Sequence, residues 1–175
     1  MHPTEIKDAL KTFTIVVDSR EQPNERALKR YSSFGCQWER QKLDYGDYTA
    51  FFSVPDMGTV SLDKKAVVER KMSVDELCAC YTHDRDRFVR EFDRAKQDGA
   101  KIYLLIEESS WERVYSGNYR SKMQPQSLVG SILAFLARYD CQILMCKKET
   151  SGKLIHDILY REARELMERM CADGS

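Results

Sequence analysis

The sequence of 175 residues has no excess of either charge, no long hydrophobic run and few structure-breaking residues. Lys plus Arg equals Asp plus Glu, 28 each, so no global positive field indicates a nucleic-acid ligand, and any DNA-binding surface must be local. No apolar run approaches the length of a membrane span, and the polar N-terminus lacks a signal-peptide pattern. These absences predict an intracellular protein, cytoplasmic if its source is prokaryotic or viral.

The cysteines show no spacing typical of a metal site. Six cysteines occur without a CxxC pair, and the three histidines are scattered, which excludes the usual zinc sites. Cys78, Cys80 and Cys141 lie in apolar segments, where buried free thiols are the simplest interpretation. Free thiols favour a reducing compartment.

The order of secondary structure predicts one α/β domain over residues 1–175, since no linker or repeat divides the chain. A turn region at 55–65 has room for a short strand, and a short helix or turn is expected near Trp111. Strands first, then alternation with helices, favour a mixed sheet flanked by helices. The expected strands are about 12–18, 36–43, 48–54, 66–71, 101–107 and 141–146, and the expected helices are 24–34, 74–81, 84–97, 126–138 and 153–171.

The buried strand "VVERK" ends in three charges. Side chains alternate along a strand, so Glu69 and Lys71 point to one face and Arg70 to the other. One interpretation is an ordinary strand end in water, followed by a helix that Ser73 and Glu76 start as a capping box. The alternative is a reaction site, because a carboxylate beside a lysine can bind a hard cation and stabilise developing negative charge.

A second acid lies in the strand pattern "LDYGDYTAFF". Asp47 is the acid within this aromatic-rich segment, and Gly46 before it permits a bulge or a close backbone approach. An Asp, a spacer and then Glu-x-Lys resembles the PD-(D/E)XK nucleases. In those enzymes the two acids bind a divalent cation and the lysine assists attack of water on a phosphodiester.

The longer pattern is more specific. Gly46-Asp47, then Glu69-Arg70-Lys71, three residues and Asp75 resemble the "GD…ERKxxxD" signature of the XPF/Hef nuclease family. "VVDSRE" and "YLLIEE" resemble two further strands of that family, so the resemblance covers about residues 13–146, before the C-terminal helix at 153–171. It implies a restriction-endonuclease-like central mixed β-sheet flanked by helices, and a DNA endonuclease acting on branched or flap DNA in repair or recombination.

The resemblance also implies roles for the site residues. Asp47 and Glu69 would bind Mg²⁺ or Mn²⁺ with the backbone carbonyl of Arg70, and Lys71 would orient water or stabilise the transition state. Asp18, Glu21 and Asp75 would be outer acids: the first two would bind the metal through water, and Asp75 would orient Lys71 or Arg70.

Two basic segments are candidates for DNA contact. In "DRDRFVREFDRAK" the arginines Arg87, Arg90 and Arg94 share a helix face, but the interleaved acids leave a solvated face as an equal alternative. In the segment 115–126, Tyr119 can stack on a base while Arg120 and Lys122 reach phosphates, or the segment is a plain surface turn. Arg20 is either a phosphate ligand or an ion-pair partner of Asp18 or Glu21.

The sequence does not determine the oligomeric state or the partner proteins of this chain. Fork-cutting members usually carry a helix-hairpin-helix module, and nothing after residue 150 has room for one, so a separate DNA-binding partner protein is expected. Helices near this end form a dimer interface in XPF-like domains, which implies a homodimer. The alternatives are a catalytically silent DNA-binding or dimerisation subunit, and a PD-(D/E)XK nuclease of other specificity such as a resolvase or nickase.

Overall fold

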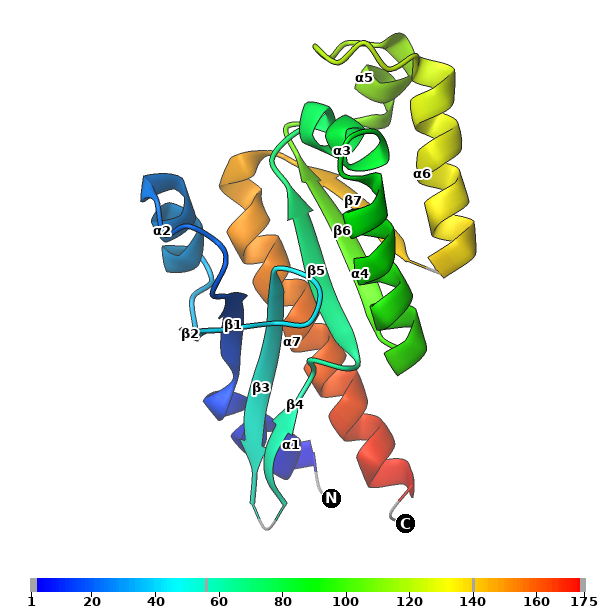
Figure 1. Ribbon diagram of the computed structural model, residues 1–175. Helices are drawn as coiled ribbons and strands as arrows, with labels where there is room; N and C mark the ends of the chain where they lie inside the picture. The colour runs from blue at the N-terminus through cyan, green and yellow to red at the C-terminus, as the bar shows by residue number, and fades with distance from the viewer. Residues whose placement is uncertain (1–2, 56, 140, 174–175) are drawn as a thin grey trace.

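A computed structural model describes residues 3–55, 57–139 and 141–173, and a mixed sheet crosses the whole of it (Figure 1). Its order is β2-β1-β3-β5-β6-β7, with β4 paired to the outer part of β3. β1 is parallel to β2, and β5, β6 and β7 are mutually parallel, while β3 runs antiparallel to its neighbours. The strands are β1 (Thr14–Asp18), β2 (Gln37–Gln41), β3 (Tyr48–Val54), β4 (Gly58–Ser61), β5 (Ala66–Lys71), β6 (Lys101–Glu107) and β7 (Gln142–Cys146).

Helices cover both faces of the sheet, which confirms the predicted fold class. In Figure 1, α3, α4 and α6 lie in front of the sheet, and the long α7 crosses behind it. The short α1 and α2 pack on the same side as α7. The helices are α1 (Pro3–Ala9), the 3-10 turn η1 (Leu10–Thr12), α2 (Glu25–Ser32), α3 (Val74–Tyr81), α4 (Arg85–Asp98), α5 (Trp111–Ser116), α6 (Pro125–Tyr139) and α7 (Lys148–Asp173).

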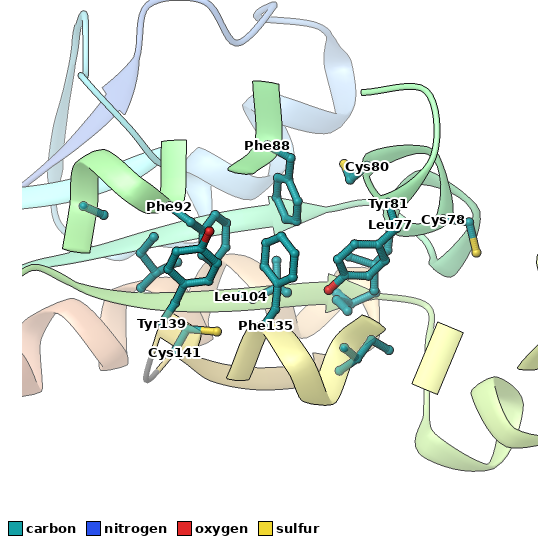
Figure 2. Packing of buried hydrophobic residues seen from close by; sticks show 14 of the residues in the cluster. Leu77, Cys78, Cys80, Tyr81, Phe88, Phe92, Leu104, Phe135, Tyr139 and Cys141 are labelled. Atoms are coloured by element: carbon teal, nitrogen blue, oxygen red, sulfur yellow. The ribbon is translucent and has the colours of Figure 1, made fainter. Parts of the chain in front are cut away.

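An aromatic cluster fixes α4 and α6 to the front of the sheet (Figure 2). Phe88 and Phe135 stack with ring centroids 5.2 Å apart, and Phe92 meets Tyr139 edge-on at 5.3 Å. Such pairs add about 1 kcal/mol each beyond the burial of their area. The cluster therefore places α4 firmly beside the end of β5.

The apolar stripe of α7 forms the core behind the sheet. Ile155 and Leu159 are fully buried, and the buried row continues through Ala163 and Met167. Leu166 and Met170 pack only partly against this core. The stripe is thus occupied within the chain.

The start of α7 differs from the prediction, and Gly152 lies inside the helix. A Cβ at this position would lie 2.0 Å from Ser33 Oγ and 2.5 Å from the carbonyl oxygen of Arg30. The glycine therefore permits close contact with α2, and the helix begins at Lys148 rather than at 153. The helix α1 was not predicted. None of the helices in the described ranges combines the length and the apolar character needed to cross a bilayer.

Candidate active site

A cavity of about 250 Å³ opens where β5 ends, between the sheet edge and the helices α3 and α4. Six of the seven predicted catalytic residues line it: Asp18, Glu21, Asp47, Glu69, Arg70 and Lys71. A larger cavity of about 440 Å³ lies on the other side of the segment 41–45, over the polar face of β3 and β4. Because the smaller cavity contains the predicted catalytic residues, it is the candidate active site.

Asp47 reaches the cavity because β3 and β5 separate beyond one residue pair. Tyr48 pairs with Val68, and the ladder then ends. The amide of Asp47 donates to the carbonyl of Val68 at 2.9 Å, and its Oδ2 accepts the Arg70 amide at 2.7 Å. The Asp47 side chain thereby satisfies the free edge of β5, where a strand would otherwise bind.

Gly46 makes this approach possible, as its place before Asp47 predicted. Its φ is +72°, and a Cβ here would lie 2.9 Å from the Cβ of Val67. A left-handed backbone at such short range favours glycine. Gly46 therefore allows the backbone to place Asp47 at the cavity.

Glu69 and Lys71 share a face of β5, which confirms the prediction from strand alternation. Lys71 Nζ donates to Glu69 Oε1 at 2.6 Å, and both side chains are buried. The Lys71 ammonium also lies 5.1 Å from the ring centroid of Phe88, within range of a cation–π contact. Arg70 extends from the opposite face, as expected.

The electrostatics of the cavity leave negative charge incompletely balanced. Burial and the nearby Glu69 carboxylate raise the pKa of Asp47 to about 8. Burial also raises the pKa of Glu69, although Lys71 opposes this change. Burial disfavours the Lys71 ammonium, but the charge and hydrogen bond of Glu69, together with the nearby Cys80 and Asp47, outweigh that effect and raise the pKa of Lys71. Two adjacent acids with one ammonium provide an environment that a further cation would stabilise.

The donor atoms fit a hard divalent cation. Within the described ranges, no group of three or more His, Cys, Asp or Glu side chains is arranged to hold a metal. Asp47, Glu69 and the Arg70 carbonyl supply oxygen atoms only, and Mg²⁺ commonly binds through one or two carboxylates, with water and substrate phosphates completing its shell. The residues present therefore suit Mg²⁺ or Mn²⁺ and exclude a zinc-type set.

Asp18 and Glu21 have partners of their own. Arg20 donates from Nε to Asp18 Oδ2 at 2.7 Å and from Nη2 to the Leu43 carbonyl at 3.1 Å, so it is the ion-pair partner of Asp18. Glu21 accepts the hydroxyls of Tyr31 at 2.9 Å and Tyr48 at 2.5 Å. These bonds give Glu21 a structural environment that its expected role as a water-mediated metal ligand did not include.

Asp75 is placed differently from its expected role beside Lys71 or Arg70. Its Oδ1 accepts the amides of Arg120 at 2.8 Å and Ser121 at 2.6 Å. Asp75 belongs to the first turn of α3, where the chain has already left the strand direction. Its carboxylate therefore positions the segment that follows α5.

In the segment 115–126 the basic side chains are exposed, whereas Tyr119 is partly buried. Tyr119 donates to the Met123 carbonyl at 2.8 Å and packs against the front core, which argues against the predicted base stacking. The Arg120 side chain is 92% exposed, and Lys122 is also exposed. Arg120 and Lys122 thus remain candidates for phosphate contact.

The three arginines of α4 have different environments. Arg87 lines the cavity and Arg90 is exposed. Arg94 instead donates from Nη2 to the Asp44 carbonyl at 2.8 Å. Arg94 therefore holds the segment that leads to Asp47, a role that the helix pattern did not reveal.

Sequence reasoning missed four further residues of the cavity, namely Glu76, Cys80, Phe88 and Glu91. The amide of Glu76 donates to Ser73 Oγ, so Ser73 caps α3 as predicted, while Glu76 Oε2 accepts the amide of Met72, one residue before the cap, at 2.7 Å. Glu91 Oε1 lies 4.0 Å from Arg20 Nη1. The helical spacing of Glu91 from Arg87 was a signal that the two share a face, but nothing in it indicated the cavity.

Comparisons with known proteins identify the family and the fold of this chain. Residues 17–158 match the family described as the ERCC4 domain. Among solved structures, XPF from Aeropyrum pernix is similar with a TM-score of 0.59 and 18% identity, over 83% of this chain and 59% of that one. The same archaeal protein in complex with DNA is similar with a TM-score of 0.59 and 20% identity, over 87% of this chain and 65% of that one.

The matches to solved structures cover only part of each archaeal chain. This chain spans less than two thirds of each archaeal chain, and the likeness at such low identity concerns the fold. No curated protein has a sequence that matches it. The sequence match nevertheless extends from β1 into α7 and includes every residue of the Gly-Asp and Glu-Arg-Lys motifs. The chain belongs to the ERCC4 domain family, the XPF-type nuclease domains.

Proposed function

We propose that this chain is a divalent-metal-dependent DNA endonuclease that hydrolyses phosphodiester bonds at branched or flap DNA in repair or recombination. The observation that carries the proposal is the meeting of Asp47, Glu69 and Lys71 at one cavity. Membership of the ERCC4 domain family supports the reaction class. The DNA complex of the archaeal relative supports DNA as the ligand.

Each motif residue has a role that its position supports. Asp47, Glu69 and the Arg70 carbonyl would hold Mg²⁺ or Mn²⁺, which supplies Lewis acidity and lowers the pKa of bound water. Lys71, fixed by Glu69 at 2.6 Å, places its ammonium where it stabilises negative charge on the phosphate. Asp18 is a proposed outer acid of this site. Phe88 closes one side of the cavity and limits water around the lysine.

The DNA would approach across the rim of the cavity. Arg87 at the rim and the exposed Arg90, Arg120 and Lys122 are proposed to contact backbone phosphates. Such contacts position a duplex without reading its sequence, which suits recognition of DNA structure.

A homodimer remains part of this proposal, with α6 and β7 as its surface. Leu133 on α6 is 49% exposed, and β7 is the last strand of the described sheet order, so its outer edge is open. A separate DNA-binding protein is proposed to supply the grip on the branched substrate.

The test incubates purified protein with labelled flap, splayed-arm, four-way and linear DNA, in Mg²⁺, Mn²⁺ or chelator. Asp47→Ala and Lys71→Ala are compared with Asp63→Ala, which removes an exposed acid outside the cavity. Metal-dependent cuts that only the first two variants lose would support the nuclease, and the preferred substrate would separate a flap enzyme from a resolvase or nickase. Salt-sensitive binding without cleavage in all proteins would leave a silent DNA-binding subunit instead.

A further inference from the structure

Four charged side chains form a closed ring on the side of β5 away from Lys71. In this charge ring, Arg30 forms an ion pair with Glu21 and also lies near Glu107, with 3.6 Å between Arg30 Nη1 and Glu107 Oε1. Arg70 closes the ring, because its Nη1 lies 3.2 Å from Glu107 Oε2 and its Nη2 lies 3.3 Å from Glu21 Oε1. The charges alternate in sign and sum to zero. The ring joins α2, β5, β6 and the segment after β1 at one point.

The charge ring is largely buried, although Glu21 and Arg70 also line the cavity. Its side chains are between 6% and 17% exposed. Tyr48 donates to Glu21 at 2.5 Å and accepts from Arg30 Nε at 2.9 Å, and Tyr31 adds a third hydroxyl contact. Removing one member of a buried ion pair leaves the other charge uncompensated and is strongly destabilising. Replacing such charges with apolar residues is often neutral or stabilising, so stability alone does not explain the ring.

Arg70 connects the charge ring to the candidate active site. Its guanidinium belongs to the ring, while its amide donates to Asp47 Oδ2 at 2.7 Å. β3 no longer pairs with β5 beyond Val68, so one edge of the strand is without a ladder at Arg70. The guanidinium contacts therefore supply a restraint on this residue that the sheet itself lacks on that side.

We propose that Arg30 and Glu107 are positioning residues for the nuclease reaction. Through the charge ring they fix the orientation of Arg70, so that its amide binds Asp47 and its carbonyl joins the oxygen atoms that hold the metal. Neither residue touches the reacting atoms. The inference rests on the proposed function and assigns it two residues, one on α2 and one at the end of β6.

The test compares Glu107→Gln with Glu162→Gln, a matched change on an unrelated ion pair. Glu162 accepts from Lys101 Nζ at 2.5 Å and from the Tyr103 hydroxyl, at the other end of β6. Both variants lose one carboxylate from an ion pair. Mn²⁺ affinity is measured by titration calorimetry on folded protein without DNA, and kcat and KM are measured on the DNA that the wild type cuts.

Loss of an outer-shell partner typically lowers metal affinity or activity 10- to 100-fold. We expect Glu107→Gln to weaken Mn²⁺ binding and to lower kcat by about tenfold or more, with KM for DNA within about twofold. Glu162→Gln should leave both the Mn²⁺ affinity and kcat at the wild-type values. Equal behaviour of the two variants in a protein that cuts DNA would overturn the positioning role and leave the nuclease intact.

A milder variant decides the case in which Glu107→Gln does not fold. Tyr48→Phe removes two contacts to the charge ring without changing its charge. It should weaken Mn²⁺ binding at least severalfold, and unchanged affinity would overturn the inference. If the wild type neither binds Mn²⁺ nor cuts DNA, the proposed function itself falls, which is a different result from failure of the ring alone.

Discussion

Replacing Asp47 by Asn should abolish cleavage and, at the same time, stabilise the fold near neutral pH. Asparagine keeps an oxygen to accept the Arg70 amide and removes a buried charge beside Glu69. The pKa of Asp47 is raised from 3.8 to about 8, so at pH 7 the folded chain must take up a proton that the unfolded chain lacks. At about 1.4 kcal/mol per pH unit above the unfolded pKa, the cost is on the order of 4 kcal/mol. The Asp47→Asn variant avoids this cost because its amide side chain does not ionise.

Urea unfolding without metal measures the effect at pH 5, 7 and 8.5. An acid whose folded pKa is raised loses stability as pH rises from about 4 to about 8, so the advantage of Asp47→Asn should grow along this series and nearly vanish towards pH 4. Asp63→Asn, at an exposed position, is the control and should show no such trend. A variant less stable than wild type at pH 8.5, or a difference independent of pH, would refute the account of the buried acids.

Three further outcomes are expected. Gly46→Ala should destabilise the fold by a few kcal/mol in thermal or urea unfolding and displace the next residue, because φ is +72° and the new Cβ would lie 2.9 Å from Val67; wild-type stability would contradict the close approach. Asp75→Ala should release the backbone amide of Arg120 and speed its exchange in hydrogen-exchange measurements. The variant should also raise the KM for DNA more than it lowers kcat. Unchanged exchange of this amide would contradict the contact. Millimolar Mg²⁺ should raise Tm more at pH 9 than at pH 6, since the cation competes with the proton on Asp47 until the pH exceeds about 8; an equal increase at both pH values would argue against Asp47 as a ligand.

The sequence predicted the parts of this molecule that depend on local pattern. The strands β3, β5 and β6 and the helix α3 have the expected bounds, because period-two alternation, a capping box and turn residues act within a few positions. The shared face of Glu69 and Lys71 follows from the same alternation. Their meeting with Asp47 needed a family signature, since pattern alone does not say which strands are neighbours.

The remaining features depend on contacts between distant positions. Arg30 has no local signal in the sequence that it meets Glu107. The contact of Gly152 with Arg30 on α2 has no signal in the sequence either. Asp75 was expected to orient Lys71 or Arg70, although the first turn of α3 directs its carboxylate to the segment after α5. Tertiary packing overrode local inference in each case.

The close contact of Gly152 with the carbonyl of Arg30 links the assembly of the site to the order of synthesis. α2 leaves the ribosome early, whereas α7 follows every other described element. A nascent chain that has reached residue 146 already contains all the proposed catalytic residues, but lacks the helix that buries the rear of the sheet and fixes α2. Contacts between such distant segments require closure of a long loop, which is slow compared with local folding. The core behind the sheet is therefore closed only once α7 has been synthesised, and we expect the proposed cutting activity to follow that step.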